Sequence, residues 1–310
     1  MNLVLKGGGI RGIAYTGALS ELEKNKITDS IANVAGTSVG AIVGTLFSVG
    51  YSAAELRELM FGLRIEQFND GEWFFLGGQK RLRKNYGWYK GEKMQFWLAN
   101  LIKEKTGNGN LTFAQLHTLK QRNTKFKDLY ITATNITKQR VEIFDWYTYP
   151  DMPIINAVKA STAVPLYFSA VFIDSVGNII KQSTTDKQGD IMIDGGLLAN
   201  YPLAIFDTNG INNNTLGLKL ERPEQIDRYK ASGDIAPYNS INSFNSYLAA
   251  LYNLFIETLN RKGTYKEEQF RTVYISTSNL NPRVRTITLK QKELLYENGE
   301  NAVRQFLKNK

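Results

Sequence analysis

The sequence contains no cysteine and only one histidine, His117, among 310 residues. Without cysteine the chain can have no disulfide, no thiolate nucleophile and no cysteine-ligated metal. A zinc site would then need mostly carboxylate ligands, which zinc sites seldom use, so we expect no metal. No apolar run reaches the ~20 residues of a membrane-spanning helix, and Met1–Leu5 is too short for the apolar part of a signal peptide. We therefore expect a cytoplasmic protein.

Acidic residues are outnumbered as well, because 38 lysines and arginines face 29 aspartates and glutamates, which gives a net charge of +9. A positive charge of this size suits anionic partners, either nucleic acid or an acidic lipid surface. A basic face that meets only solvent explains the same charge. Composition alone leaves these three interpretations open, so motifs must decide between them.

No linker and no internal repeat divides the chain. We therefore expect a single domain over residues 1–310, with a catalytic core of about 1–205 and a C-terminal elaboration of about 206–310. Short apolar segments separated by helical ones predict a three-layer α/β/α fold with a mostly parallel central sheet. Polar stretches rich in asparagine, glycine and proline predict loops at 209–215 and 222–240. The expected strands are 3–5, 31–35, 129–133, 141–144, 191–193, 216–220 and 273–275, with helices at about 13–25 and 39–47.

The segment Gly36-Thr37-Ser38-Val39-Gly40 has the form of a nucleophile elbow, a serine on a sharp strand-to-helix turn. The predicted strand delivers Ser38 to a helix N-terminus, where unpaired amides and the helix dipole favour the negative charge that develops on its oxygen. A plain helix cap explains the same residues. On its own the motif does not choose between the two.

A second glycine-rich turn, Gly7-Gly8-Gly9-Ile10-Arg11-Gly12, also follows a predicted strand and opens a helix. It matches the dinucleotide-binding pattern formally, but the second strand leads into Ser38 and not to the acidic residue that binds a ribose. Successive glycines also let backbone amides converge on one point, as an oxyanion hole requires. A tight turn alone seldom needs three glycines in a row. Together with Ser38, the segment favours an oxyanion hole, with Arg11 beside it to meet a substrate phosphate.

The candidate base for Ser38 is Asp194, which ends an apolar strand before Gly195 and Gly196. The two glycines leave room around the carboxylate, which can take the serine proton directly from ~2.6–3.2 Å. An ordinary aspartate pKa of ~3.9 matches a serine hydroxyl poorly, so oxyanion stabilisation must assist the transfer. His117 lies among leucines of a predicted helix and precedes Asp194, unlike the α/β-hydrolase order, so we assign it a structural role.

Together the three motifs resemble the patatin-like phospholipase family, in the family's order and over most of the chain. The resemblance implies a patatin-like fold, Ser38 as nucleophile, Asp194 as base and Gly7–Gly12 as oxyanion hole. It also implies no metal or organic cofactor, and cleavage of acyl esters of glycerolipids. Further segments similar to the family are Ala133-Thr134-Asn135, Ala160-Ser161-Thr162-Ala163-Val164-Pro165 and Asn200-Tyr201-Pro202.

Aromatic and basic residues gather between positions 73 and 90. Rings beside cations are typical of an anionic membrane interface. They also suit single-stranded nucleic acid, or a flap whose rings pack on the core. We treat contact with a membrane as the hypothesis to test. The residues concerned are Trp73, Phe74, Phe75, Lys80, Arg81, Arg83, Lys84 and Trp88.

The sequence thus predicts a serine acyl hydrolase of phospholipase A or lysophospholipase type. Its expected partners are phospholipids and an anionic membrane that it visits peripherally, with no nucleic acid. Two alternatives remain at this stage: a nucleotide-binding protein that uses the glycine-rich turn, and a lipid-binding module without catalysis.

Overall fold

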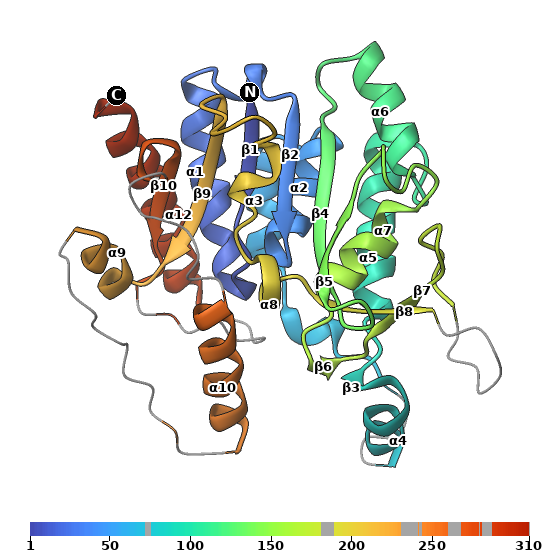
Figure 1. The fold of residues 1–310 in the computed structure, drawn as a ribbon. Coiled ribbons are helices and arrows are strands. Elements are labelled where there is room, and N and C mark those ends of the chain that lie inside the picture. Colours follow the sequence, from blue (N-terminus) through green and yellow to red (C-terminus); the bar gives the residue numbers. More distant parts are fainter. Residues whose placement is uncertain are drawn as a thin grey trace.

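The computed structural model describes residues 1–71, 76–180, 189–230, 241, 244–259, 268–278, 280 and 287–309. Its centre is an eight-stranded sheet in the order β10-β9-β1-β2-β4-β8-β7, with β5 paired to β4, and strands β3 and β6 form a small second sheet (Figure 1). The strands are β1 Asn2–Leu5, β2 Asn33–Thr37, β3 Gly87–Tyr89, β4 Asp128–Asn135, β5 Arg140–Phe144, β6 Leu166–Phe168, β7 Val171–Ile173, β8 Asp190–Asp194, β9 Thr215–Glu221 and β10 Thr272–Ser276.

Five neighbouring strands, from β10 to β4, run parallel, whereas β5, β7 and β8 pair antiparallel. Parallel strands are covered on both faces and therefore consist largely of apolar residues. In β1, Leu3 and Leu5 enter the large core while Val4 faces a smaller cluster with Ala35 and Leu203. The predicted α/β architecture with a mostly parallel sheet is confirmed.

Helices α1, α2 and α12 pack on the side of the large core, and α8 with the 3-10 helix η4 covers part of the other. Among the described residues, no helix is both long enough and apolar enough to cross a bilayer. The helices are α1 Ala14–Lys24, α2 Val39–Ser48, α3 Ala53–Gly62, α4 Leu76–Asn85, α5 Glu92–Thr106, α6 Phe113–Arg122, α7 Ile154–Ser161, α8 Gly196–Ala199, α9 Pro223–Lys230, α10 Phe244–Leu259 and α12 Leu289–Lys308; the 3-10 segments are η1 Gly9–Ile13, η2 Thr28–Ser30, η3 Ile65–Phe68, η4 Leu203–Phe206 and η5 Gln269–Arg271.

The C-terminal third contributes directly to this sheet, since β9 lies between β1 and β10. Helix α12 then returns to pack along α1. Their backbones touch at two glycines: a Cβ on Gly17 would lie 1.9 Å from the carbonyl oxygen of Tyr296, and one on Gly299 would lie 2.0 Å from that of Ala14. The contact joins the N-terminal and C-terminal parts of the chain on one side of the sheet.

The loop predicted at 222–240 is wrong for its first part, where α9 begins at Pro223. Proline is well suited to the first helical position because its missing N–H needs no partner there. The side chain of Gln225 accepts the amide of Arg222 at 2.9 Å, which satisfies a group that the helix itself leaves unpaired. Residues 231–240 lie outside the described part of the chain.

Candidate active site

Strand β4 brings the two predicted catalytic residues together. It pairs with β2 through residues 128–132, with β8 through 133–135, and with β5 through 131–135. Because β5 overlaps both of the others, it must occupy one edge of β4, and β2 and β8 share the opposite edge in succession. Strand β2 ends at Thr37 and β8 ends at Asp194, which is paired with Ala133. Ser38 therefore leaves β2 just where Asp194 arrives.

Ser38 occupies a strained turn between β2 and α2, with φ 54° and ψ −121°. Few side chains adopt a positive φ, and such residues concentrate at functional sites. The flanking glycines are required by contact: a Cβ on Gly36 would lie 2.3 Å from the Gly40 oxygen, and one on Gly40 would lie 2.3 Å from the Leu5 oxygen. The turn thus has the geometry that the elbow motif predicts.

Asp194 contacts Ser38 directly. The Ser38 hydroxyl donates to Oδ2 of Asp194 at 2.8 Å, and the amide of Gly196 donates to Oδ1 at 2.7 Å. Only 3% of Asp194 is exposed. Burial raises the pKa of Asp194 to about 6, although both hydrogen bonds act in the opposite direction. The difference in pKa between Asp194 and a serine hydroxyl is therefore smaller than it would be for an ordinary aspartate.

Helix α8 is held against the same strands. A Cβ on Gly195 would lie 2.3 Å from the Thr132 oxygen, so only glycine fits that approach. The Thr37 hydroxyl contacts the Thr132 hydroxyl at 2.6 Å and donates to the Ala199 carbonyl at 2.8 Å. Thr37, next to Ser38, thereby fixes the last turn of the helix that follows Asp194.

Ser161, at the end of α7, was not identified as a site residue from the sequence. Its side chain is fully buried, and its hydroxyl accepts the Ser38 amide at 2.9 Å. Two residues later, the Ala163 carbonyl accepts the Asp194 amide at 2.9 Å. This short segment therefore positions Ser38 and Asp194 together. Its only sequence signal was the family-like run Ala160–Pro165.

The glycine-rich turn lies beside Ser38, since a Cβ on Gly7 would lie 3.4 Å from the Ser38 Cβ. The Gly7 amide donates to the Asn200 carbonyl at 2.9 Å, so it serves to attach the turn to the end of α8. Gly9 has φ 58°, which glycine adopts without strain. The amides of Gly8, Gly9 and Ile10 precede the first closed turn of η1, where a helix supplies no internal acceptor.

The rest of the turn is packed tightly. A Cβ on Gly12 would lie 2.3 Å from a Val39 methyl carbon, so this glycine allows η1 to contact the start of α2. Arg11 is 9% exposed, and its Nε donates to the Gly8 carbonyl at 3.0 Å. The guanidinium therefore braces the turn from within.

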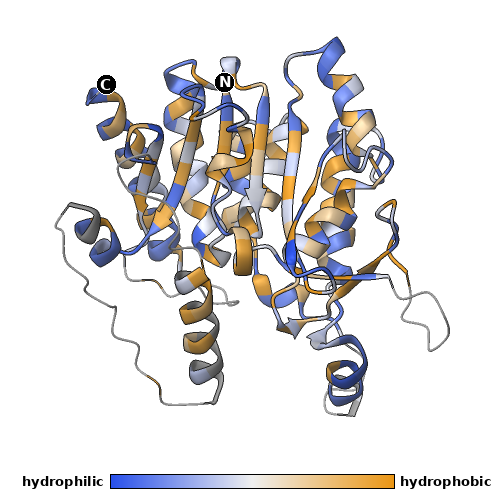
Figure 2. Cartoon of the chain, viewed as in Figure 1, coloured by the Kyte–Doolittle hydropathy of each residue, from blue (hydrophilic) through white to orange (hydrophobic). Residues whose placement is uncertain are grey.

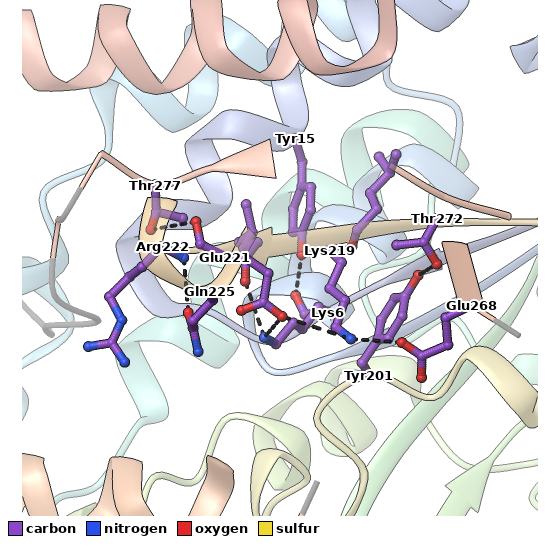
Figure 3. Close-up of polar contacts among 12 residues, drawn as sticks. Lys6, Tyr15, Tyr201, Lys219, Glu221, Arg222, Gln225, Glu268, Thr272 and Thr277 are labelled. Atoms are coloured by element: carbon purple, nitrogen blue, oxygen red, sulfur yellow. Dashed lines mark hydrogen bonds and ion pairs between the residues drawn. The ribbon is translucent and has the colours of Figure 1, made fainter. Parts of the chain in front are cut away.

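A buried ionic network supports the residue before the glycines (Figure 3). The Lys6 ammonium lies 2.9 Å from Oε1 of Glu221, the last residue of β9, and Lys219 lies 3.9 Å from the same oxygen. Lys219 also pairs with Glu268 at 2.8 Å. Burial lowers the pKa of Lys6, and the Glu221 carboxylate opposes that change. The Tyr15 hydroxyl donates to the Lys6 carbonyl, so both ends of this residue are held.

His117 lies near the amino end of β4, far from the candidate site. Its Nδ1 is 2.8 Å from Asp128, the first residue of β4, and its ring stacks on Trp146 with centroids 4.0 Å apart. Ser38 and Asp194 lie beyond the opposite end of the paired β2 segment. The structural assignment of His117 is therefore consistent with its position.

The segment predicted to meet a membrane divides into two groups. Lys80, Arg83 and Lys84 are exposed on α4 and line one surface hollow with Gln79. Arg81 and Trp88 are half-buried and contact each other, since Nε of Arg81 donates to the Trp88 carbonyl at 2.9 Å. The remaining three residues, Trp73, Phe74 and Phe75, lie outside the described part of the chain.

Comparison with known proteins identifies the class. A family profile described as patatin-like phospholipase matches residues 3–207. Uncharacterized protein R571 of Acanthamoeba polyphaga mimivirus is 30% identical over 312 residues, which cover 98% of this chain and 92% of that protein. Probable lipid hydrolase 463L of Invertebrate iridescent virus 6 is 29% identical over 209 residues, which cover 66% of this chain and 62% of that protein.

The fold has a solved counterpart in VipD from Legionella pneumophila, with a TM-score of 0.62 at 19% identity. The match covers 99% of this chain and 66% of VipD. Fold and sequence define an α/β enzyme of the lipid hydrolase class. The chain belongs to the patatin-like phospholipase family, as its three motifs predicted.

Proposed function

We propose that this protein is a serine acyl hydrolase that cleaves fatty-acyl esters of membrane glycerophospholipids with a Ser38–Asp194 dyad. The observation that carries the proposal is the 2.8 Å hydrogen bond from the Ser38 hydroxyl to Oδ2 of Asp194. It joins a strained serine to a buried carboxylate, with no imidazole between them. Family membership supplies the lipid ester as the substrate class.

In the acylation step, Asp194 takes the Ser38 proton while the serine oxygen attacks the ester carbonyl carbon. The carbonyl oxygen becomes an oxyanion, and we assign its donors to the amides of Gly8, Gly9 and Ile10, because the Gly7 amide already serves Asn200. The intermediate then expels the alcohol portion of the lipid, which receives the proton from Asp194. Ser38 is left esterified to the fatty acid.

In the deacylation step, water attacks the acyl-serine ester and gives its proton to Asp194. Collapse of the second intermediate releases the fatty acid, and Ser38 recovers the proton from Asp194. The acid must be ionised at the start of each step. With burial raising the pKa of Asp194 to about 6, the carboxylate is mostly ionised at neutral pH and more basic than an exposed aspartate.

The proposed substrate lies in a membrane, and the exposed cations of α4 provide an electrostatic contact with it. Lys80, Arg83 and Lys84 occupy neighbouring positions on successive turns of this helix. Each cation near an anionic bilayer contributes ~1 kcal/mol of attraction. We therefore propose that the enzyme acts peripherally on anionic membranes. The buried Ser38–Asp194 contact supports catalysis over a lipid-binding module without activity.

Mass spectrometry of the products from mixed phospholipid vesicles tests this proposal. Wild-type protein should release fatty acid and lysophospholipid, and Ser38→Ala should lose ~10⁴-fold or more of that activity. The matched control is Ser30→Ala, because Ser30 is exposed and its hydroxyl donates only to the nearby Ile27 carbonyl. Equal fatty-acid release by Ser38→Ala and wild type would refute the proposal.

A further inference from the structure

Helix α10 exposes several large apolar side chains. Its 16 residues include one charged side chain, Glu257. Tyr247 is 49% exposed, Leu254 57%, Phe255 50% and Leu259 41%. None of the α10 side chains that the structure describes is buried. Exposed apolar patches of this kind mark sites of contact with proteins, ligands or membranes.

The exposed side chains and the half-buried Leu251 share one face of the helix. With about 100° between successive residues, Tyr247, Leu251, Leu254 and Phe255 fall within ~100° of arc, and Leu259 follows at the margin. Ile256 points the opposite way and contacts the catalytic turn, where its Cδ1 lies 3.5 Å from a Cβ built on Gly196. One face of α10 is thus placed against the residue that hydrogen-bonds Asp194, and the other is turned outward.

The position of α10 relates this apolar face to the basic helix α4. Both helices project beyond the carboxyl ends of the parallel strands (Figure 1). Ser38 and Asp194 lie at this same end of the sheet. Figure 2 shows α4 as mostly hydrophilic and α10 with hydrophobic residues along its length. The chain therefore presents an apolar helix and a cationic helix at the same end as its proposed active site.

We propose that α10 is an interfacial lipid-binding helix. Its apolar stripe, Tyr247, Leu251, Leu254, Phe255 and Leu259, enters the headgroup–acyl boundary of an anionic bilayer while the cations of α4 contact the headgroups. This inference rests on the proposed function, because a phospholipid ester must reach Ser38 from a membrane. An apolar surface and a basic surface at the same end of the molecule are what an amphipathic membrane contact requires.

Charge favours a bilayer over a second copy of the chain as the occupant of this stripe. A second copy brings its own net charge of +9, which opposes association, whereas an anionic bilayer attracts it. Binding of α10 to the bilayer would also turn the end of the sheet where Ser38 lies toward the lipid. The helix then couples membrane binding to the catalytic turn through Ile256 and Gly196.

Cosedimentation of the full chain with vesicles of equal parts phosphatidylcholine and phosphatidylglycerol tests the inference. The double variant Leu254→Gln/Phe255→Gln should bind ~10²-fold more weakly, given the apolar area removed from the contact. The matched control is Phe270→Gln, since Phe270 is 73% exposed but lies in η5, at the amino end of β10 and away from the carboxyl ends of the parallel strands. It should bind like wild type. Arg83→Gln/Lys84→Gln should weaken binding to these vesicles more than binding to pure phosphatidylcholine.

Activity separates this inference from the proposed function. In the Leu254/Phe255 variant, the rate on vesicles should fall at least ~10-fold further than the rate on a dissolved short-chain ester. If the Leu254/Phe255 variant bound vesicles as tightly as wild type, the inference would be overturned. It would also be overturned if the variant lost activity equally on vesicles and on the dissolved ester and had a lower unfolding temperature. A wild-type dimer that the variant dissociates, with vesicle binding intact, would assign the stripe to a second copy and also overturn it. If no ester is cleaved but vesicle binding is lost, the proposed function fails and the lipid-binding helix stands.

Discussion

Asp194 and Glu221 are two carboxylates buried to a similar degree, with 3% and 1% of their surfaces exposed. Each ends a strand, but their surroundings differ. Asp194 accepts hydrogen bonds from neutral donors, the Ser38 hydroxyl and the Gly196 amide. Glu221 is paired with Lys6, and Lys219 lies close by. The contrast separates a carboxylate whose pKa is raised by burial, which we propose as the base, from one paired with a cation beneath the glycine-rich turn.

This contrast carries a stability consequence of defined sign. Because the pKa of Asp194 is higher in the native state than in the unfolded state, the native state favours the protonated carboxyl group. The stability that this preference contributes is complete below about pH 4 and is lost as the pH rises through about 6. Relative to a neutral side chain, the charged form destabilises the native state at pH 7 by ~3 kcal/mol. Glu221, paired with a cation, should behave in the opposite way when its charge is removed.

Asp194→Asn should give the largest effect. Loss of the base is expected to slow fatty-acid release by ~10²–10⁴-fold. Removal of the buried charge should raise the free energy of unfolding at pH 7 by up to ~3 kcal/mol, and this gain should shrink as the pH falls to 4. Urea unfolding at the two pH values measures it. A variant that is less stable than wild type at pH 7 would show that the carboxylate is compensated after all.

Glu221→Gln should have the reverse effect on stability. It leaves the Lys6 ammonium beside a neutral amide, and loss of one partner from a buried pair costs ~3–5 kcal/mol. The turnover number should fall by up to ~10²-fold, because Lys6 precedes the glycine-rich turn and small displacements of catalytic groups have effects of that size. Unfolding and kinetics on a dissolved ester measure both. If this variant were as stable as wild type, Glu221 would not stabilise the fold through its pairing with Lys6.

Lys6→Met sharpens the comparison further. Glu221 then retains Lys219, 3.9 Å away, so the loss of stability should be smaller than in Glu221→Gln. The double variant Lys6→Met/Glu221→Gln should lose less than the sum of the two single changes, as expected for residues in direct contact. Four unfolding curves complete this cycle. Strict additivity would mean that the 2.9 Å contact between the two side chains does not couple them.

Ser161→Ala should have the smallest effect. It leaves the buried Ser38 amide without its acceptor, which costs ~1–3 kcal/mol of stability. Activity should fall as well, because the amide belongs to the strained elbow. If Ser161→Ala were instead more stable than wild type, the strained elbow at Ser38 would have relaxed into a different conformation. Thermal unfolding and fatty-acid release, with Ser30→Ala as the serine control, distinguish these outcomes.

The short segments from which the candidate site is built were predicted from the sequence. Gly36–Gly40, the turn at Gly7–Gly12 and Asp194 each carry their own local pattern, and their order along the chain identified the family. The α/β class followed from short apolar strands with helical segments between them. Helix α9 was missed because its polar composition resembles a loop, although Pro223 is a favourable first helical residue.

The supporting contacts were not predictable, because they join residues distant in sequence. Ser161 is 123 positions from Ser38, and Glu221 is 215 positions from Lys6. The periodic patterns of apolar residues that predict helices and strands carry no information about such distant pairs. The commitment of the Gly7 amide to Asn200 likewise depends on how α8 ends beside β1. The apolar face of α10 becomes visible only when the fold shows that no described side chain of that helix is buried.

The rate at which a fluorophosphonate probe labels Ser38, measured against pH and located by peptide mass spectrometry, tests most directly whether Asp194 activates this serine. The wild-type rate should rise with pH and reach half its maximum near pH 6, the pKa to which burial raises Asp194. Asp194→Asn should label at least ~10²-fold more slowly, without that midpoint. Labelling of the Asn variant at the wild-type rate, or of a residue other than Ser38, would contradict the account.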